Sequence, residues 1–197
     1  MTNIALFGPP GAGKGTQSEK LIQKYQLVHI APGELLRAQI SGRTALGQRV
    51  AQYINQGRLA PNELVIDIVE ERLAAAKNSD GFLFDGFPRT AIQAEALEEK
   101  LDRYNMQIDA VIFLEVPEEE LIRRIKSRAK IVGRADDQDE EKIATRMRIY
   151  HDATLPVAQY YAQKGKLCKV SGVGEVHAVF ERIVAVMGRL SAIPALK

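Results

Sequence analysis

The stretch Ile4-Ala-Leu-Phe-Gly-Pro-Pro-Gly-Ala-Gly-Lys-Gly-Thr16 decides the fold of this chain. Its first four residues are apolar and predict a short buried strand, the glycines predict a tight turn, and Lys14 stands where a helix begins. Glycines let a backbone bend around an anion with its N–H groups turned inward, and a helix N-terminus adds a positive dipole end. The stretch therefore predicts a phosphate-binding loop, in which Lys14 is a movable charge for the outer phosphates of a nucleotide.

The spacing Gly8-x4-Gly13-Lys14 fits the P-loop pattern, with one deviation. The residue after the lysine is Gly15, and the expected hydroxyl follows one place later, at Thr16. The alternative interpretation is a glycine-rich strand-to-helix turn that carries an unrelated lysine. The order of strand, turn, lysine and helix favours the nucleotide loop.

Composition excludes several classes of protein. A chain of 197 residues can bury a full core, and its net charge of +2 gives no basic field for nucleic acid. No apolar run approaches a membrane span, and the first strand begins too near Met1 for a signal peptide. The single cysteine, Cys168, cannot form an internal disulfide, and three scattered histidines form no metal-ligand set. We expect a cytoplasmic protein with no nucleic-acid or membrane partner.

Alternating patterns predict an α/β fold with a five-stranded parallel sheet and helices on both faces, which makes three layers. Short apolar runs predict strands at 4–7, 28–30, 82–84, 110–114 and 167–170. Helical patterns cover 13–25, 91–104, 118–128, 140–164 and 175–189. Pro156 is expected to kink or break the fourth of these helices.

Two intervals depart from the simple alternation. Between Ile30 and Phe82 only helical patterns occur, and their length predicts a helical flap at the rim of the sheet. Between Arg128 and Asp139 lies a short polar loop that we interpret as a lid. The spacing from Asp137 to Glu140 is that of a capping box, so Asp137 is expected to cap the next helix, whereas Asp136 is left to position the lid.

Arginines stand at the ends of the elements that should surround the phosphate loop. A planar guanidinium suits phosphate, and ligands of open α/β sheets bind at the C-terminal edge of the strands. Any one of these arginines could instead lie on the solvated surface, but their common placement favours a ligand site. They are Arg37, Arg89, Arg124, Arg128, Arg134 and Arg146.

Two further side chains are candidates for recognition. Asp85 ends an apolar strand that is expected beside the first one, where a carboxylate could face a nucleotide-bound magnesium ion. A plain turn aspartate before Gly86 is the alternative. Gln93 carries an amide that can pair with the edge of an adenine base.

Taken together, these motifs resemble the nucleoside monophosphate kinases, and among them the adenylate kinases, over nearly the whole chain. The motifs that carry the resemblance are Gly-Pro-Pro-Gly-Ala-Gly-Lys-Gly-Thr-Gln at 8–17, Gly33-Glu-Leu-Leu-Arg37, Asp85-Gly-Phe-Pro-Arg-Thr-x-x-Gln93, Gly133-Arg-x-Asp-Asp137, and Arg146 followed by Tyr150. In this family the Gly-Thr ending of the phosphate loop is usual.

The resemblance implies a three-layer P-loop fold and the reaction ATP plus AMP giving two ADP, with magnesium and a monomeric protein. It divides the chain into a core of residues 1–30, 61–126 and 138–197, an AMP-binding flap at 31–60 and a short lid at 127–137. The lid has no cysteine, so the zinc site of long-lid relatives is excluded. No direct protein ligand to the metal is implied, and Asp85 would act through magnesium-bound water.

The resemblance also assigns roles residue by residue. The ATP site would consist of Gly11, Ala12, Gly13, Lys14, Gly15, Thr16, Arg128 and Gly174. The AMP site would consist of Pro32, Arg37, Arg58, Leu59, Ala60, Gly86, Phe87, Pro88, Arg89, Gln93, Arg134 and Arg146. The catalytic set would be Lys14, Asp85, Arg89, Arg128, Arg134 and Arg146.

One residue departs from the family pattern, and two alternatives to an adenylate kinase stay open. Pro32 stands where adenylate kinases usually have threonine and the pyrimidine-specific relatives alanine, which predicts weaker or altered AMP binding.

A UMP/CMP kinase shares the short lid. Gln93 favours adenine, however, because those enzymes typically have asparagine in this region. A nucleotide-binding switch would need an Asn-Lys-x-Asp segment, which the sequence lacks, and would leave the second group of arginines without a role.

Overall fold

A five-stranded parallel sheet forms the centre of the molecule, as the sequence predicts. The computed structural model describes residues 2–192. The strands are β1 (Thr2–Phe7), β2 (Val28–Ile30), β3 (Gly81–Asp85), β4 (Ala110–Glu115) and β5 (Leu167–Ser171), in the spatial order β2-β3-β1-β4-β5. β1 therefore lies between β3 and β4, which brings Asp85 to the same edge as the end of β1.

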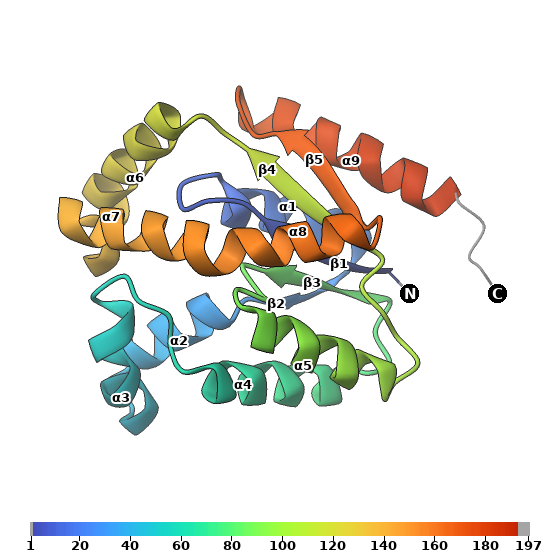
Figure 1. The fold of residues 1–197 in the computed structure, drawn as a ribbon, viewed down its shortest axis with the longest axis horizontal. Coiled ribbons are helices and arrows are strands. Elements are labelled where there is room, and N and C mark those ends of the chain that lie inside the picture. Colours follow the sequence, from blue (N-terminus) through green and yellow to red (C-terminus); the bar gives the residue numbers. More distant parts are fainter. Residues whose placement is uncertain (1, 193–197) are drawn as a thin grey trace.

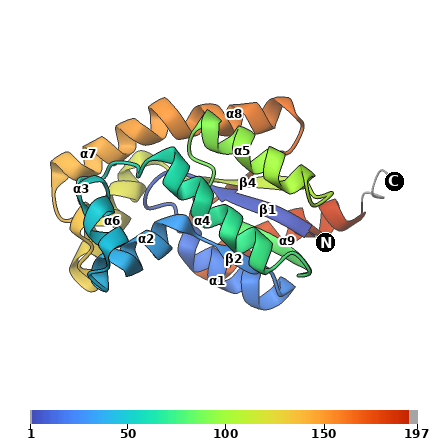
Figure 2. The same cartoon turned by 90° about the horizontal axis from the view of Figure 1, so that it is seen from below.

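Helices cover both faces of the sheet, so the fold has three layers (Figures 1 and 2). One face carries α1 (Lys14–Tyr25) and α9 (Val176–Ala192), and the other carries α4 (Asn62–Ala75), α5 (Ala91–Asp102) and α8 (Leu155–Gln163). Within β1, Ile4 and Leu6 pack toward the first face while Ala5 and Phe7 pack toward the second. This alternation follows from the two-residue period of a strand that is buried on both sides. Within residues 2–192, no helix combines the length and the apolar character that a membrane span requires.

Helices α2 (Pro32–Ser41) and α3 (Ala45–Ile54) form the predicted helical flap beyond the end of β2. Pro32 occupies the first turn of α2, where its missing N–H leaves no bond unmade, and Glu34 complements the helix dipole there. Thr44 caps α3 by accepting a bond of 3.0 Å from the N–H of Gly47. The two helices pack closely, since a Cβ built on Gly47 would lie 2.0 Å from the carbonyl oxygen of Gln39.

The segment around the predicted lid differs from the prediction. Helix α6 runs over Glu118–Val132, past the predicted end at Arg128, because no helix-breaking residue occurs before Gly133. Gly133 ends the helix with a left-handed backbone of φ +66°. The connection to α7 (Glu140–Ile149) is therefore shorter than expected, and it contains one turn of 3₁₀-helix, Ala135–Asp137.

The prediction that Asp137 caps α7 is wrong. Asp139 is the capping residue, and its Oδ1 accepts a bond of 2.8 Å from the N–H of Glu141. Asp137 is instead buried within the 3₁₀ turn, where arginines surround it.

Pro156 does not break the long helix but coincides with a change in its winding. A π-helical turn, Tyr150–Thr154, lies between α7 and α8, and Pro156 stands in the first turn of α8. Proline has no N–H to donate to the preceding turn, so a looser turn upstream is a physical way to continue the helical path. In place of the predicted kink or break, the helix carries a local π-helical turn just before Pro156.

The contrast between two helical glycines gives a test of the flap packing. Gly47→Ala forces a methyl group onto the backbone of Gln39 and is expected to cost about 1–3 kcal/mol of the free energy of unfolding. Gly188→Ala in α9 meets no atom within 4 Å, so it should stabilise the protein by about 0.5–1 kcal/mol through helix propensity. Thermal unfolding of both variants checks this, and equal shifts of Tm would contradict the close packing of α2 on α3.

Candidate active site

The glycine-rich segment forms a tight loop between β1 and α1. Gly8, Gly11 and Gly13 have φ values of +147°, +84° and +92°, a region that disfavours other residues. A Cβ built on Gly11 would lie 2.8 Å from the carbonyl oxygen of Leu121, so the loop also packs directly against α6. Gly15 is different, because it belongs to the first turn of α1 and has an ordinary helical backbone.

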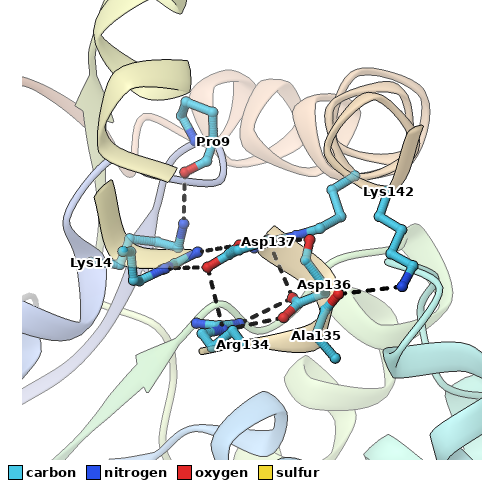
Figure 3. Close-up of polar contacts among 9 residues, drawn as sticks. Pro9, Lys14, Arg134, Ala135, Asp136, Asp137 and Lys142 are labelled. Carbon is cyan, nitrogen blue, oxygen red and sulfur yellow. Dashed lines mark hydrogen bonds and ion pairs between the residues drawn. The ribbon is translucent and has the colours of Figure 1, made fainter. Parts of the chain in front are cut away.

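The ammonium group of Lys14 lies inside this loop (Figure 3). Its Nζ donates to the carbonyl oxygens of Gly8 at 2.7 Å and Pro9 at 3.0 Å. The pKa of Lys14 is lowered to about 7 by burial, which the charge of Asp85 opposes and the nearby guanidinium groups, that of Arg89 foremost, reinforce. The amino group of Lys14 is therefore desolvated, and within the loop it is bonded to two backbone carbonyls.

Asp85 ends β3 directly beside the first turn of α1. Ser18 Oγ donates to its Oδ2 at 2.9 Å, and His29 Nε2 lies 3.6 Å from the same oxygen. Burial raises the pKa of Asp85, but the contact with His29, the charge of Lys14 and the bond from Ser18 outweigh it and hold that pKa below its ordinary value. Sequence reasoning missed Ser18 and His29, because only the fold brings α1 and β2 to the end of β3.

Two carboxylates of the lid, those of Asp136 and Asp137, form ion pairs with three guanidinium groups. The side chain of Asp137 is fully buried, and it bonds Arg128 Nε at 2.6 Å and Arg128 Nη2 at 2.9 Å. Its other close partner is Arg146 Nη1. Asp136 accepts two bonds of 3.2 Å from Arg134 (Figure 3) and lies 3.2 Å from Arg146 Nη1.

The carboxylates and the guanidinium groups shift each other's pKa values. Although burial raises the pKa of Asp136, the charges of Arg146 and Arg134 hold it below its ordinary value. Burial in turn lowers the pKa of Arg146, which Asp136 and Asp137 oppose. Guanidinium groups are not deprotonated in proteins, so these contacts are ion pairs at neutral pH.

The turn after β3 positions Arg89. Arg89 Nε donates to the carbonyl oxygen of Gly86 at 2.6 Å, and a Cβ on Gly86 would lie 2.8 Å from Arg89 Nη2. Thr154 Oγ1, from the π-helical turn, donates to the carbonyl oxygen of Arg89 at 3.2 Å. Phe87 is buried in the core beside Phe84.

The amide of Gln93 is bound on both sides. Its Oε1 accepts from the N–H of Arg89 at 2.8 Å, and its Nε2 donates to Asn62 Oδ1 at 2.9 Å. Gln93 is only 2% exposed. Asn62 begins α4, thirty-one positions away in the sequence, and gave no sequence signal of its own.

One cavity joins the phosphate loop, the flap and the lid. Twelve of the residues that the sequence assigned to nucleotide binding or catalysis line it: Lys14, Pro32, Arg37, Arg58, Leu59, Ala60, Gly86, Pro88, Arg89, Gln93, Arg134 and Arg146. Its wall, as far as residues 2–192 describe it, does not include Gly11, Ala12, Gly13, Gly15, Thr16, Asp85, Phe87, Arg128 or Gly174. Asp136, Tyr150 and Thr154 complete the lid side.

Gly174 lies in a separate loop, after β5, that packs against the phosphate loop. A Cβ on Gly172 would lie 3.5 Å from the carbonyl oxygen of Ala12. Arg124 Nη2 donates to the carbonyl oxygen of Gly172 at 3.0 Å, and Arg182 Nη1 donates to those of Ser171 and Val173 at 2.7 and 2.8 Å. Gly174 itself has a φ of +105°. The structure thus places this loop and Arg124 next to the phosphate loop, on the side away from the flap.

Comparison with known proteins identifies the family. The family model described as adenylate kinase matches residues 6–166. The adenylate kinase of Phocaeicola vulgatus is 45% identical over 190 residues, which cover 96% of this chain and 100% of that protein. That of Bacteroides thetaiotaomicron is 44% identical over the same coverage, and one from Porphyromonas gingivalis is 44% identical over 96% of this chain and 97% of its own length. These matches confirm the resemblance and favour it over a UMP/CMP kinase or a nucleotide-binding switch. The chain belongs to the adenylate kinase family of phosphotransferases.

Proposed function

We propose that this protein transfers the γ-phosphoryl group of ATP to AMP, reversibly, and that the cavity between flap and lid is where the two phosphate chains meet. One observation carries the proposal: Lys14 and five arginines line the same cavity. These arginines come from different parts of the chain, since Arg37 belongs to the flap, Arg89 to the core and Arg134 to the lid. A single bound phosphate group would not need so many cations. Two nucleotides with adjoining phosphates would.

The AMP side of the site is assigned to the flap and to the turn after β3. Arg37 and Arg89 lie close together, since a Cβ on Gly33 would be 3.4 Å from Arg37 Nη1 and 3.6 Å from Arg89 Nη2. Both can hold the phosphate of AMP, while Gln93 lines the wall where its base would lie. Leu59 and Ala60 supply apolar surface for that base.

The ATP side is assigned to the phosphate loop. Lys14 and the loop N–H groups would bind the outer phosphates, Arg128 would line them from α6, and the loop around Gly174 would meet the adenine. The contact between that loop and Ala12 supports this assignment, because it puts a base site beside a phosphate site.

In the reaction, an oxygen of the AMP phosphate attacks the γ-phosphorus, and the bond from that phosphorus to the β–γ bridging oxygen breaks. No protein side chain forms a covalent bond, and no proton transfer is required. Lys14, Arg89, Arg134 and Arg146 offset the negative charge that spreads over the transferred group. The flap also reaches α7, which follows the lid, since a Cβ on Gly57 would be 2.8 Å from both Arg146 Cγ and the Lys142 carbonyl oxygen, and this closeness helps to exclude water.

The residues present fit a magnesium ion that is carried by the nucleotide. A Cβ on Gly15 would lie 3.7 Å from Glu34 Oε1 and 4.0 Å from Asp85 Oδ2, so two carboxylates face the start of α1. No group of three or more possible ligands occurs in the part of the chain that the structure describes, which favours contact through water over direct ligation. When bound, magnesium would neutralise phosphate charge; the carboxylates would orient its water ligands.

We further infer a monomeric, cytoplasmic protein whose partners are ATP, AMP and ADP. The cavity is formed by one chain, and Cys168 is a free thiol in the described residues. Gel filtration and cell fractionation test the two statements separately.

Arg89 is the side chain on which turnover is expected to depend most. Arg89→Ala should lower kcat for ATP and AMP about 10³-fold, because a buried cation at the transferring group is lost. Arg123→Ala, which truncates a 71% exposed arginine of α6, is the matched control and should keep wild-type turnover. A coupled assay of ADP formation measures both, and near-wild-type turnover of Arg89→Ala would refute the assignment.

Pro32 is expected to weaken AMP binding. It lines the cavity but offers neither a hydroxyl nor an N–H to the phosphate. Pro32→Thr should lower the KM for AMP about fivefold, which corresponds to one added hydrogen bond of about 1 kcal/mol, with kcat unchanged. Unaltered KM values in steady-state kinetics with varied AMP would show that the position does not contact the monophosphate.

The lowered pKa of Lys14 predicts a pH-dependent affinity. Phosphates favour the charged amine, so ATP binding takes up a proton at any pH above the pKa of about 7. The Kd for magnesium-ATP should therefore rise up to tenfold per pH unit above pH 7.5, and titration calorimetry in buffers of different ionisation heat measures both effects. Lys14→Met should bind weakly and without this pH dependence. A wild-type Kd that is constant from pH 7 to 9 would contradict the prediction.

A further inference from the structure

The amide group of Gln93 is fixed in one of its two possible orientations. The backbone N–H of Arg89 points at one amide atom from 2.8 Å, and a backbone N–H can only donate. That atom is therefore the oxygen, Oε1, and the other is the nitrogen, Nε2. A half-turn of the amide would place two donors against each other at this contact.

Asn62 enforces the same orientation from the opposite side. Its Oδ1 accepts from Gln93 Nε2 at 2.9 Å and also from Thr90 Oγ1 at 3.1 Å. The hydroxyl of Thr90 accepts in turn from the N–H of Gln93 at 3.2 Å, so its hydrogen is free to point toward Asn62. Donors and acceptors alternate without conflict along the chain of bonds. With the amide reversed, two oxygens would face each other at Asn62.

The fixed amide keeps one free hydrogen-bond donor and one free hydrogen-bond acceptor. One hydrogen of Nε2 and one lone pair of Oε1 remain after the bonds to Asn62 and Arg89. Gln93 lines the cavity and is 2% exposed, so these two groups have little access to water. A buried donor and acceptor favour a ligand that pairs both and reject one that pairs neither.

The free donor and acceptor of Gln93 are complementary to the edge of one type of base. Adenine presents a donor, the 6-amino group, beside an acceptor, N1, which complement Oε1 and Nε2 of the fixed amide. Hypoxanthine has the same ring system but presents an oxygen beside an N–H, the reverse pattern. An amide that was free to turn over would accept either base.

We propose that Asn62 is a specificity-determining positioning residue: it locks the amide of Gln93 so that the monophosphate site selects a 6-amino purine over a 6-oxo purine. The proposal rests on the proposed role of Gln93 in the AMP site. Asn62 does not line the cavity itself, and it acts on the base site through its bonds to Gln93 and Thr90.

Inosine monophosphate is the probe, because it differs from AMP only in the polarity of the edge in question. The quantity to measure is the ratio of kcat/KM for AMP to kcat/KM for inosine monophosphate, with ATP as donor. Asn62→Ala should lower this ratio about tenfold, whereas Asn62→Asp, whose carboxylate accepts the same bond, should keep it within about threefold. The ratio of AMP to CMP should change little in both, since cytosine presents the same donor and acceptor order as adenine.

Two controls separate the lock from general damage. Asn78→Ala makes the same truncation at an exposed site and should leave the ratio unchanged. If Asn62→Ala does not fold, Asn62→Ser replaces it, because a hydroxyl can accept or donate and so permits both amide orientations. Tm values within a few degrees of the wild type qualify a variant for comparison.

The outcomes are distinguishable. If folded Asn62→Ala or Asn62→Ser keeps the wild-type ratio while Gln93→Ala loses it, the proposed lock is wrong and the role of Gln93 stands. If Gln93→Ala also keeps the ratio, the assignment of the base site falls, and the lock falls with it. A loss in Asn62→Ala that Asn62→Asp restores supports the inference.

Discussion

The structure depends on keeping many positive charges in one partly desolvated place. Lys14, Arg89, Arg134 and Arg146 line a single cavity, and each of the last two is less than a fifth exposed. Like charges at such separations repel, and burial adds a desolvation cost for each ion. Asp136 and Asp137 offset this repulsion, since each contacts two or more guanidinium groups. The segment around Asp136 and Asp137 is thus held by charge balance more than by apolar packing.

The rigid part of the site has a different origin. The phosphate loop is held by glycine geometry, by the buried strand before it and by direct contact with α6. Arg89 is held by the carbonyl oxygen of Gly86 and by Thr154. In each of these supports a backbone carbonyl or a close backbone contact takes part, whereas the arginines near Asp136 and Asp137 are held by ion pairs between side chains.

The sequence predicted what depends on local pattern, and it missed what depends on three-dimensional neighbours. Alternation of apolar runs and helical patterns was sufficient for the sheet, the flap and the position of the arginines. The loop before α7 was predicted too long because polarity was taken as a loop signal, although Ala129–Val132 contain no helix breaker. Asp137 was assigned to a cap because spacing alone cannot distinguish it from Asp139. Asn62, Ser18 and His29 were missed because each acts on a partner from another element, and no short-range pattern records such pairs.

The π-helical turn between α7 and α8 bears on how the wall of the site could have arisen. In a regular α-helix, residues eight apart differ by about 80° in direction, yet Arg146 and Thr154 both line the cavity, with Tyr150 between them. The wider winding of Tyr150–Thr154 reduces that angular drift. The surplus residue of the π-helical turn therefore acts as a phase correction that keeps side chains of α7 and of the turn itself on one wall of the cavity. The same continuous helical path thus contacts the lid through Arg146 and the backbone of Arg89 through Thr154.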